Sequence, residues 1–283
     1  GAMAAAYIAT LEAKRKREDP EHVWNLLMWG LIGGILGARL YHVLSLSPTG
    51  ANPGFNYYFI EQPFTTLTLF GVEIPFPTAL LIWRGGIGIF GGIIGGLLTT
   101  IIYTRKNQLY FWRWLDIMAP GMLLAQAMGR WGNYFNQELY GPPTGLPWGI
   151  LITNPNQRIP PYDNLTQYPL NTTFHPVFLY ESLWNLVGFL LLFWIARRFA
   201  DKLLDGDLAS LYFIWYPVGR IFTESIRLDV WSVGGIPTAQ IFSALLILAG
   251  LGLIYYRRHN PALATNPATH PTAQPKVRRP ARK

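Results

Sequence analysis

The chain has 283 residues, of which 51% are hydrophobic and only 13% are charged, and it contains 11 tryptophans. Soluble domains are about a quarter charged, so this composition excludes an ordinary soluble protein. The formal net charge is +8, and cysteine is absent. Disulfides and thiolate metal sites are therefore excluded as well. We expect an integral membrane protein.

Six apolar blocks reach or approach the length of a membrane span, which is roughly 20 helical residues. They cover residues 23–46, 79–103, 115–128, 176–195, 208–223 and 238–256. Residues 1–11 form a further apolar stretch of about half a span. A basic run follows this stretch, whereas a signal peptide begins with one. We expect this stretch to be the tail of a seventh helix, which comes first in the chain and is truncated at Gly1.

Lysine and arginine gather in the loops that fall on one side of the membrane if each block crosses once. Four lie in residues 12–21, three in 105–113, three in 197–202 and seven after Tyr256, out of 23 in all. Loops rich in these residues stay in the cytoplasm. We therefore expect a cytoplasmic C-terminus, and we attribute the positive charge to topology and anionic lipids rather than to nucleic acid.

Two segments lack helical periodicity. Residues 132–174 contain seven prolines, which exclude a continuous helix and predict a small irregular insert on the outer side. Residues 260–283, rich in Pro, Ala, Thr and Arg, predict a disordered basic cytoplasmic tail. The expected fold is an all-α membrane domain, residues 1–259, of about seven transmembrane helices with this insert.

Five arginines lie in or beside the expected spans, where a charge costs several kcal/mol unless it is satisfied. They are Arg39, Arg84, Arg130, Arg220 and Arg227. Arg39 and Arg220 fall roughly 24 and 18 Å from the cytoplasmic ends of their helices at about 1.5 Å per residue. Arg130 lies at the outer end of the block at 115–128, and Arg227 lies just past the outer end of the block at 208–223. All but Arg84 are expected at one depth in the outer leaflet.

The block at 208–223 shows a clear local pattern. Tyr216, Arg220, Glu224 and Arg227 recur at spacings of four, four and three, so they share one helical face. A structural Arg–Glu pair beside an interfacial tyrosine explains this pattern. An anion site explains it too, because arginine exceeds its carboxylate partner and a guanidinium binds phosphate oxygens in bidentate geometry.

Two other patterns are less specific. Glycines recur at four-residue spacing near residues 30–37 and 85–96, which favours close helix packing over a phosphate loop, because no Lys–Ser/Thr follows. At the entrance to the block at 176–195, His175 suits a capping, interfacial or catalytic role. Glu181 is expected to hold an arginine through a charge-assisted hydrogen bond.

Residues 129–141 read Gly-Arg-Trp-Gly-Asn-Tyr-Phe-Asn-Gln-Glu-Leu-Tyr-Gly. This run resembles the hallmark segment of the bacterial phosphatidylglycerol–prolipoprotein diacylglyceryl transferases. The resemblance continues, in the same order, in residues 37–39, in the glycines after Trp83, and in residues 175–181 and 216–227. It implies seven helices with the N-terminus outside, in the bacterial inner membrane.

The resemblance also implies an activity. We expect it to need no metal or cofactor, because the sequence has no His or Cys pair at ligand spacing and no Asp cluster in the spans. The diacylglyceryl group of phosphatidylglycerol passes to the lipobox cysteine of a preprolipoprotein, which forms a thioether and releases glycerol phosphate. Fixed cations must stabilise the leaving phosphate, and the thiol must either lose its proton or be drawn toward thiolate by nearby positive charge. The residues expected to be catalytic are Arg130, Arg220 and Glu224. Those expected to bind substrate are Arg39, Asn133, Asn136, Glu138, Gly141, His175, Tyr180, Glu181, Tyr216 and Arg227.

One position departs from the family pattern. Many members have a histidine, often regarded as a general base, where this chain has Phe90. A phenyl ring cannot accept a proton, so that role is either dispensable or filled by Glu224 or Glu138.

The residues alone leave three rival functions open. A transporter of an anionic substrate would also place arginines in a polar cavity. A structural scaffold would tolerate neutral residues at Arg130 and Arg220. A metal-dependent headgroup transferase would need clustered carboxylates, and the spans hold too few.

Overall fold

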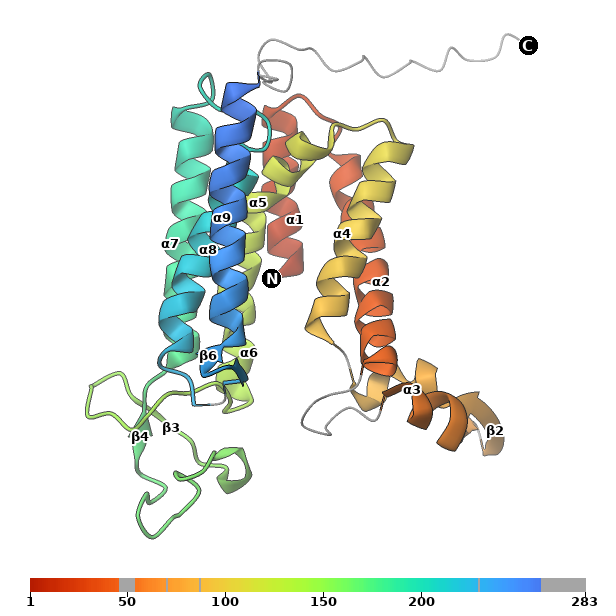
Figure 1. Ribbon diagram of the computed structural model, residues 1–283, viewed down its shortest axis with the longest axis vertical. Coiled ribbons are helices and arrows are strands. Elements are labelled where there is room, and N and C mark those ends of the chain that lie inside the picture. The colour runs from red at the N-terminus through yellow and green to blue at the C-terminus, as the bar shows by residue number, and fades with distance from the viewer. Residues whose placement is uncertain (46–53, 70, 87, 229, 261–283) are drawn as a thin grey trace. The chain divides into compact units, whose positions relative to one another are not determined.

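The computed structural model describes residues 1–45, 54–69, 71–86, 88–228 and 230–260, and it is mostly helical (Figure 1). The chain divides into two compact units. One comprises Gly1–Pro20 and the chain from Trp112 onward, and the other comprises Glu21–Phe111. The expected tail after Asn260 lies outside the described residues.

In the unit Glu21–Phe111, the helices α2 (Glu21–Leu44) and α4 (Ile89–Lys106) pack side by side. A Cβ atom on Gly37 would collide with the carbonyl oxygen of Gly91, and one on Gly95 would collide with that of Gly33. The two backbones therefore touch at these glycines, as the packing interpretation predicts.

The described residues between these helices form short elements. It contains α3 (Gly54–Asn56), a π-helical turn (Tyr57–Glu61), and the antiparallel strands β1 (Phe64–Leu69) and β2 (Val72–Pro77). Two 3-10 turns, Thr78–Leu80 and Ile82–Arg84, follow. The expectation of one helix over residues 79–103 is therefore wrong for its first ten residues, because α4 begins only at Ile89.

The late start of α4 has a local cause. Gly85 and Gly86 have φ angles of +86° and +74°, a left-handed conformation that a right-handed helix cannot include. Their carbonyl groups both accept hydrogen bonds from the Arg39 guanidinium, so these carbonyls are not available to a helix. The fold is mostly helical rather than all-α, because short hairpins join the helices.

The described residues of the other unit form five long helices. They are α1 (Ala2–Arg15), α5 (Phe111–Gly129), α7 (Val177–Arg198), α8 (Asp207–Glu224) and α9 (Thr238–His259). A core from α5, α7 and α8 includes Leu123, Leu192 and Tyr212. The apolar stretch at residues 1–11 is helical as expected, and α1 packs on α5, where a Cβ atom on Gly121 would lie 2.6 Å from the carbonyl oxygen of Ala5.

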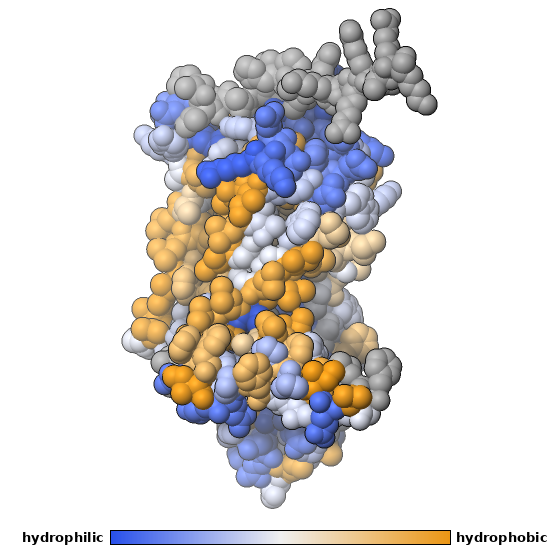
Figure 2. Space-filling model, turned by 90° about the vertical axis from the view of Figure 1, so that its right-hand side faces the viewer, coloured by the Kyte–Doolittle hydropathy of each residue, from blue (hydrophilic) through white to orange (hydrophobic). Residues whose placement is uncertain are grey.

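The helices carry the apolar surface of a membrane protein. Within the described ranges, α2, α7 and α9 are long and apolar enough to cross a membrane. Figure 2 shows hydrophobic side chains (orange) over the middle of the visible face, with hydrophilic ones (blue) gathered toward the top and the bottom of the view. Large apolar side chains on α2 and α4 are more than half exposed, including Leu31, Leu36, Leu40, Ile93 and Leu98. Burying these side chains in lipid removes them from water.

Between α5 and α7 the chain forms a small irregular segment. It contains α6 (Trp131–Phe135), the strands β3 (Ile150–Leu151) and β4 (Thr173–Phe174), and a 3-10 turn (Pro155–Gln157). The buried Arg158 donates hydrogen bonds to the carbonyl groups of Ile152, Tyr168 and Pro169. Arg158 therefore holds this segment together. A further hairpin, β5 (Ser232–Val233) and β6 (Ile236–Pro237), precedes α9.

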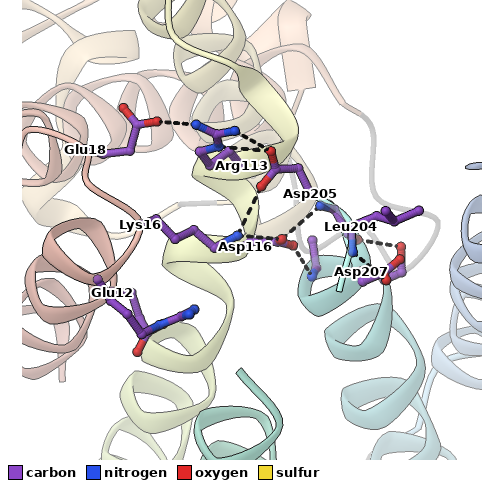
Figure 3. Close-up of polar contacts among 12 residues, drawn as sticks. Glu12, Lys16, Glu18, Arg113, Asp116, Leu204, Asp205 and Asp207 are labelled. Carbon is purple, nitrogen blue, oxygen red and sulfur yellow. Dashed lines mark hydrogen bonds and ion pairs between the residues drawn. The ribbon is translucent and has the colours of Figure 1, made fainter. Parts of the chain in front are cut away.

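A buried charge cluster joins α1, α5 and the start of α8 (Figure 3). Lys16 Nζ lies 2.9 Å from Asp116 Oδ2 and 3.3 Å from Asp205 Oδ1. Arg113 bridges Asp205 and Glu18, at 2.9 and 3.0 Å. We call these five residues the Lys16 cluster. Asp116 also accepts hydrogen bonds from two backbone amides at the start of α8, where a helix has unsatisfied N–H groups.

Candidate functional site

A second ion-pair cluster joins the ends of α5, α7 and α8. Arg130 Nε lies 2.5 Å from Glu181 Oε2, and Arg220 Nη1 lies 2.6 Å from Glu181 Oε1. The hydroxyl of Thr223 also donates to Glu181 Oε1, at 2.9 Å. Because Glu181 is only 6% exposed, its charge must be compensated by such partners. One carboxylate therefore positions two arginines, as expected for Glu181.

The cluster continues along α8. Arg220 Nη2 lies 2.7 Å from Glu224 Oε2, and Arg227 Nη1 lies 3.3 Å from the same oxygen. The predicted shared face of Arg220, Glu224 and Arg227 is therefore confirmed. We call Arg130, Glu181, Arg220, Glu224 and Arg227 the arginine cluster.

The arginine cluster carries an excess of positive charge, because three guanidinium groups face two carboxylates. Arg227 Nε is buried without a hydrogen-bond partner among the described residues. Burial, and then the positive charge of Arg220, lower the pKa of Arg227, which nevertheless remains charged. A cluster with spare guanidinium donors and excess positive charge is suited to an anionic group such as a phosphate.

The turn at residues 129–141 brings its polar residues together. The side-chain amides of Asn133 and Asn136 donate to the same oxygen of Glu138, at 2.8 and 3.1 Å. Gly141 is held by its neighbours, since a Cβ atom there would lie 2.8 Å from Ile226 Cγ2 and 3.0 Å from His175 Cβ. The absence of a side chain at Gly141 therefore lets this turn pack against the residues that flank α7 and α8.

His175 and Tyr180 form a pair at the start of α7. His175 Nδ1 lies 3.0 Å from the Tyr180 hydroxyl, which also accepts a hydrogen bond from Trp148 Nε1 at 3.1 Å. Tyr180 thus links α7 to the irregular segment. Tyr216 lies one turn before Arg220 on α8 and stacks on Tyr212 with ring centroids 5.9 Å apart.

Arg39 belongs to the other unit and is described by itself. Its guanidinium donates to the carbonyl groups of Ala79, Thr78, Gly85 and Gly86 at 2.7–3.0 Å and lies 5.1 Å from the centroid of the Tyr58 ring. Arg39 therefore holds the segment before α4, a role that its position in the sequence does not reveal. Its expected contact with substrate stays a prediction, and the side chain of Arg84 lies outside the described part.

The unit containing Glu21–Phe111 also holds a histidine that the sequence analysis did not select. His42 Nε2 lies 3.0 Å from the Tyr58 hydroxyl. A Cβ atom on Gly86 would collide with the His42 ring. A histidine two residues before the end of an apolar helix is a signal that could have drawn attention to it.

The fold and the arginine cluster define a helical membrane protein with a cationic site suited to phosphate. The sequence matches the prolipoprotein diacylglyceryl transferase family over residues 1–256. It is 43% identical to the phosphatidylglycerol–prolipoprotein diacylglyceryl transferase of Chloroflexus aggregans, over 96% of this chain and 86% of the relative. Proteins of the same description in Leifsonia xyli and Thermosynechococcus vestitus are 38% and 37% identical, over 92% and 87% of this chain and 73% and 81% of theirs.

The chain belongs to the prolipoprotein diacylglyceryl transferase family. The resemblance noted at residues 129–141 is therefore confirmed.

Proposed function

We propose that this chain transfers the diacylglyceryl group of phosphatidylglycerol to the lipobox cysteine of a preprolipoprotein, the first step of lipoprotein maturation. In this reaction a C–S bond forms, the bond between the glyceryl carbon and the phosphate oxygen breaks, and glycerol phosphate leaves. The observation that carries the proposal, beside the family membership, is the arginine cluster, because a leaving phosphate needs fixed cations.

The geometry of Arg220 suits this task. A guanidinium has five N–H donors, and the contacts of Arg220 with Glu181 and Glu224 engage Nη1 and Nη2. Donors that remain can bind phosphate oxygens while the two carboxylates fix the orientation of the group. Arg130 is oriented by Glu181 in the same way. We propose Arg130 and Arg220 as the residues that stabilise the leaving phosphate, with Arg227 as a further positive charge.

The thiol proton needs an acceptor, which Phe90 cannot be. Glu224 contacts two guanidinium groups, at 2.7 and 3.3 Å, so its protonation would weaken two ion pairs. Glu138 accepts hydrogen bonds from two neutral side-chain amides and not from guanidinium groups. Because its described contacts include no ion pair to be weakened, we favour Glu138 over Glu224 as the acceptor.

We further propose a multi-pass protein of the bacterial inner membrane, in which α1, α2, α4, α5, α7, α8 and α9 are the seven crossing segments. A cytoplasmic position of three loops and of the C-terminus is supported by the lysines and arginines in 12–21, 105–113 and 197–202. The irregular segment between α5 and α7 then faces outward, on the side where lipobox cysteines of exported proteins are modified.

The test is direct. Purified protein is mixed with phosphatidylglycerol and a lipobox peptide, and the peptide is weighed by mass spectrometry. We expect a mass gain of one diacylglyceryl group, equal release of glycerol phosphate, no product with a Cys→Ser peptide, and full activity in a strong chelator. Uptake of an anion into sealed vesicles without any lipid product would instead support the transporter alternative.

A further inference from the structure

A small pocket lies between α7 and α8, beside Arg220. It is lined by Glu181, Trp184, Asn185, Tyr216, Gly219 and Arg220, and its volume is about 10 Å³. This is about the space that one water molecule or one hydroxyl group needs. The pocket shares Glu181 and Arg220 with the arginine cluster, so an occupant would act on the site itself.

Asn185 is the residue of the pocket whose hydrogen bonding is incomplete. It lies one helical turn after Glu181 and is only 2% exposed, and its Oδ1 atom has no hydrogen-bond partner within the described ranges. A buried amide oxygen without a partner costs about 1–3 kcal/mol, and native proteins rarely leave one unsatisfied. The missing partner is therefore expected inside the pocket that Asn185 lines.

The pocket wall formed by Trp184 is closely packed, and the small volume limits the occupant to one small group. Trp184 and Trp215 stack with ring centroids 4.5 Å apart, and each indole N–H donates to the backbone carbonyl of the other residue. A Cβ atom on Gly188 would collide with Trp215, and one on Gly219 would collide with Trp184. Both rings therefore lie directly against the backbone of the neighbouring helix.

The polar atoms of the pocket select the charge of the occupant. A cation would lie beside the Arg220 guanidinium, and an anion would face the Glu181 carboxylate and Asn185 Oδ1. A neutral hydroxyl can donate a hydrogen bond to Asn185 Oδ1 and accept one from Arg220 or from the Tyr216 hydroxyl. A neutral hydroxyl therefore matches both kinds of lining atom.

We propose that this pocket binds one neutral hydroxyl group, and that Asn185 is a positioning residue that uses it to orient Arg220. The hydroxyl belongs either to a resident water or to the glycerol headgroup of the lipid, and this inference rests on the proposed transfer reaction. A headgroup hydroxyl held here would also favour a glycerol headgroup over a cationic one.

The experiment compares Asn185→Leu and Asn185→Ser with the wild type, using phosphatidylglycerol and phosphatidylpropanol, whose headgroup lacks hydroxyls. Thr238→Val is the matched control, because Thr238 also has a buried side-chain oxygen without a partner among the described residues but does not line the pocket. We expect Asn185→Leu to lower kcat at least about tenfold, because a hydroxyl that Asn185 no longer holds also loses its hydrogen bond to the charged Arg220. Asn185→Ser, which keeps a hydroxyl, should retain most activity, and Thr238→Val should change kcat little.

The two lipids identify the source of the hydroxyl. A resident water predicts the same loss for Asn185→Leu with both lipids. A headgroup hydroxyl predicts a loss with phosphatidylglycerol only, together with a wild type that is slower on phosphatidylpropanol. Values of kcat and KM within about twofold of wild type for both lipids, with an equal or higher melting temperature, would mean an empty pocket and overturn the proposal.

Two further readouts keep the outcomes distinct. If Asn185→Leu does not fold, Asn185→Ala replaces it in the same comparison. If the wild type makes no thioether at all, the proposed transfer fails, and the pocket is then judged by melting temperature with and without each lipid. In that case Asn185→Leu should melt below the wild type or lose the stabilisation by phosphatidylglycerol. Melting at or above the wild-type temperature under every condition would overturn the pocket as well.

Discussion

Glu181 shares one carboxylate between two guanidinium groups, with Oε2 facing Arg130 and Oε1 facing Arg220. Arg130 lies just after α5 and Arg220 lies on α8, so without Glu181 their positive charges would face each other inside the protein. The position of Glu181 in the first turns of α7 fixes the geometry of the whole arginine cluster.

Replacing Glu181 tests this role. Glu181→Gln removes the charge but keeps the size, and breaking a buried ion pair costs about 3–5 kcal/mol. We expect a melting temperature lower by several degrees and a loss of most transfer activity. The matched variant Glu138→Gln should melt close to wild type, since Glu138 accepts from neutral amides rather than from arginine. Equal melting of the two variants would show that Glu181 does not hold the cluster.

The sequence predicts the contacts of some residues better than those of others. The face shared by Arg220, Glu224 and Arg227 follows from helical spacing alone, because all three lie on or next to one helix. Arg39 and Arg158 could not be interpreted in this way. Their partners are backbone carbonyls in irregular segments, and the positions of those carbonyls depend on tertiary folding rather than on a local pattern.

At the scale of elements, the Lys16 cluster ties α1 to α5 and to the start of α8 (Figure 3). The side chain of Lys16 is only 6% exposed. Without this lysine, the buried Asp116 would have no cationic partner among the contacts of the described residues. We expect Lys16→Met to destabilise the protein by about 3–5 kcal/mol, seen as a lower melting temperature. Lys14→Met is the control, because Lys14 is exposed. Similar melting of both variants would contradict this account.

The contact between α2 and α4 gives a second prediction about elements. A side chain on Gly37 must push the two helices apart, whereas a Cβ atom on Gly30 meets nothing within 4 Å. Gly37→Leu should therefore lower the melting temperature and reduce the yield of folded protein, while Gly30→Leu should change little. If Gly37→Leu is tolerated as well as Gly30→Leu, the close approach of these helices is not needed for stability.

Helix positions were predictable from apolar length, since α2, α7, α8 and α9 all begin and end within a few residues of the expected blocks. The start of α4 was not predictable in this way. Apolar residues extend the block back to Ala79, yet Gly85 and Gly86 adopt left-handed backbone angles and their carbonyls bind Arg39. Apolar composition does not distinguish these residues from a helix, and the hairpin β1–β2 was missed for the same reason.

At the scale of the whole molecule, the distribution of basic residues predicts the orientation in the membrane. Single cysteines can be introduced into this cysteine-free chain and labelled in sealed cells with an impermeant thiol reagent. Asp163→Cys, in the irregular segment, should react from outside. Asn107→Cys, in the basic loop after α4, should react only after the membrane is opened. Labelling of Asn107→Cys in sealed cells would refute the orientation.

The central claim is that Arg130 and Arg220 hold the leaving phosphate through planar guanidinium geometry. Lysine at either position keeps the charge but not the planar fork, and losing one preorganised donor costs about 2.7–4 kcal/mol, roughly a hundredfold to a thousandfold in rate. The most direct measurement is the single-turnover rate of transfer to a lipobox peptide for Arg130→Lys and Arg220→Lys, with melting temperatures alongside. The account predicts folded variants that are slower by about a hundredfold or more, and near-normal rates for both would contradict it.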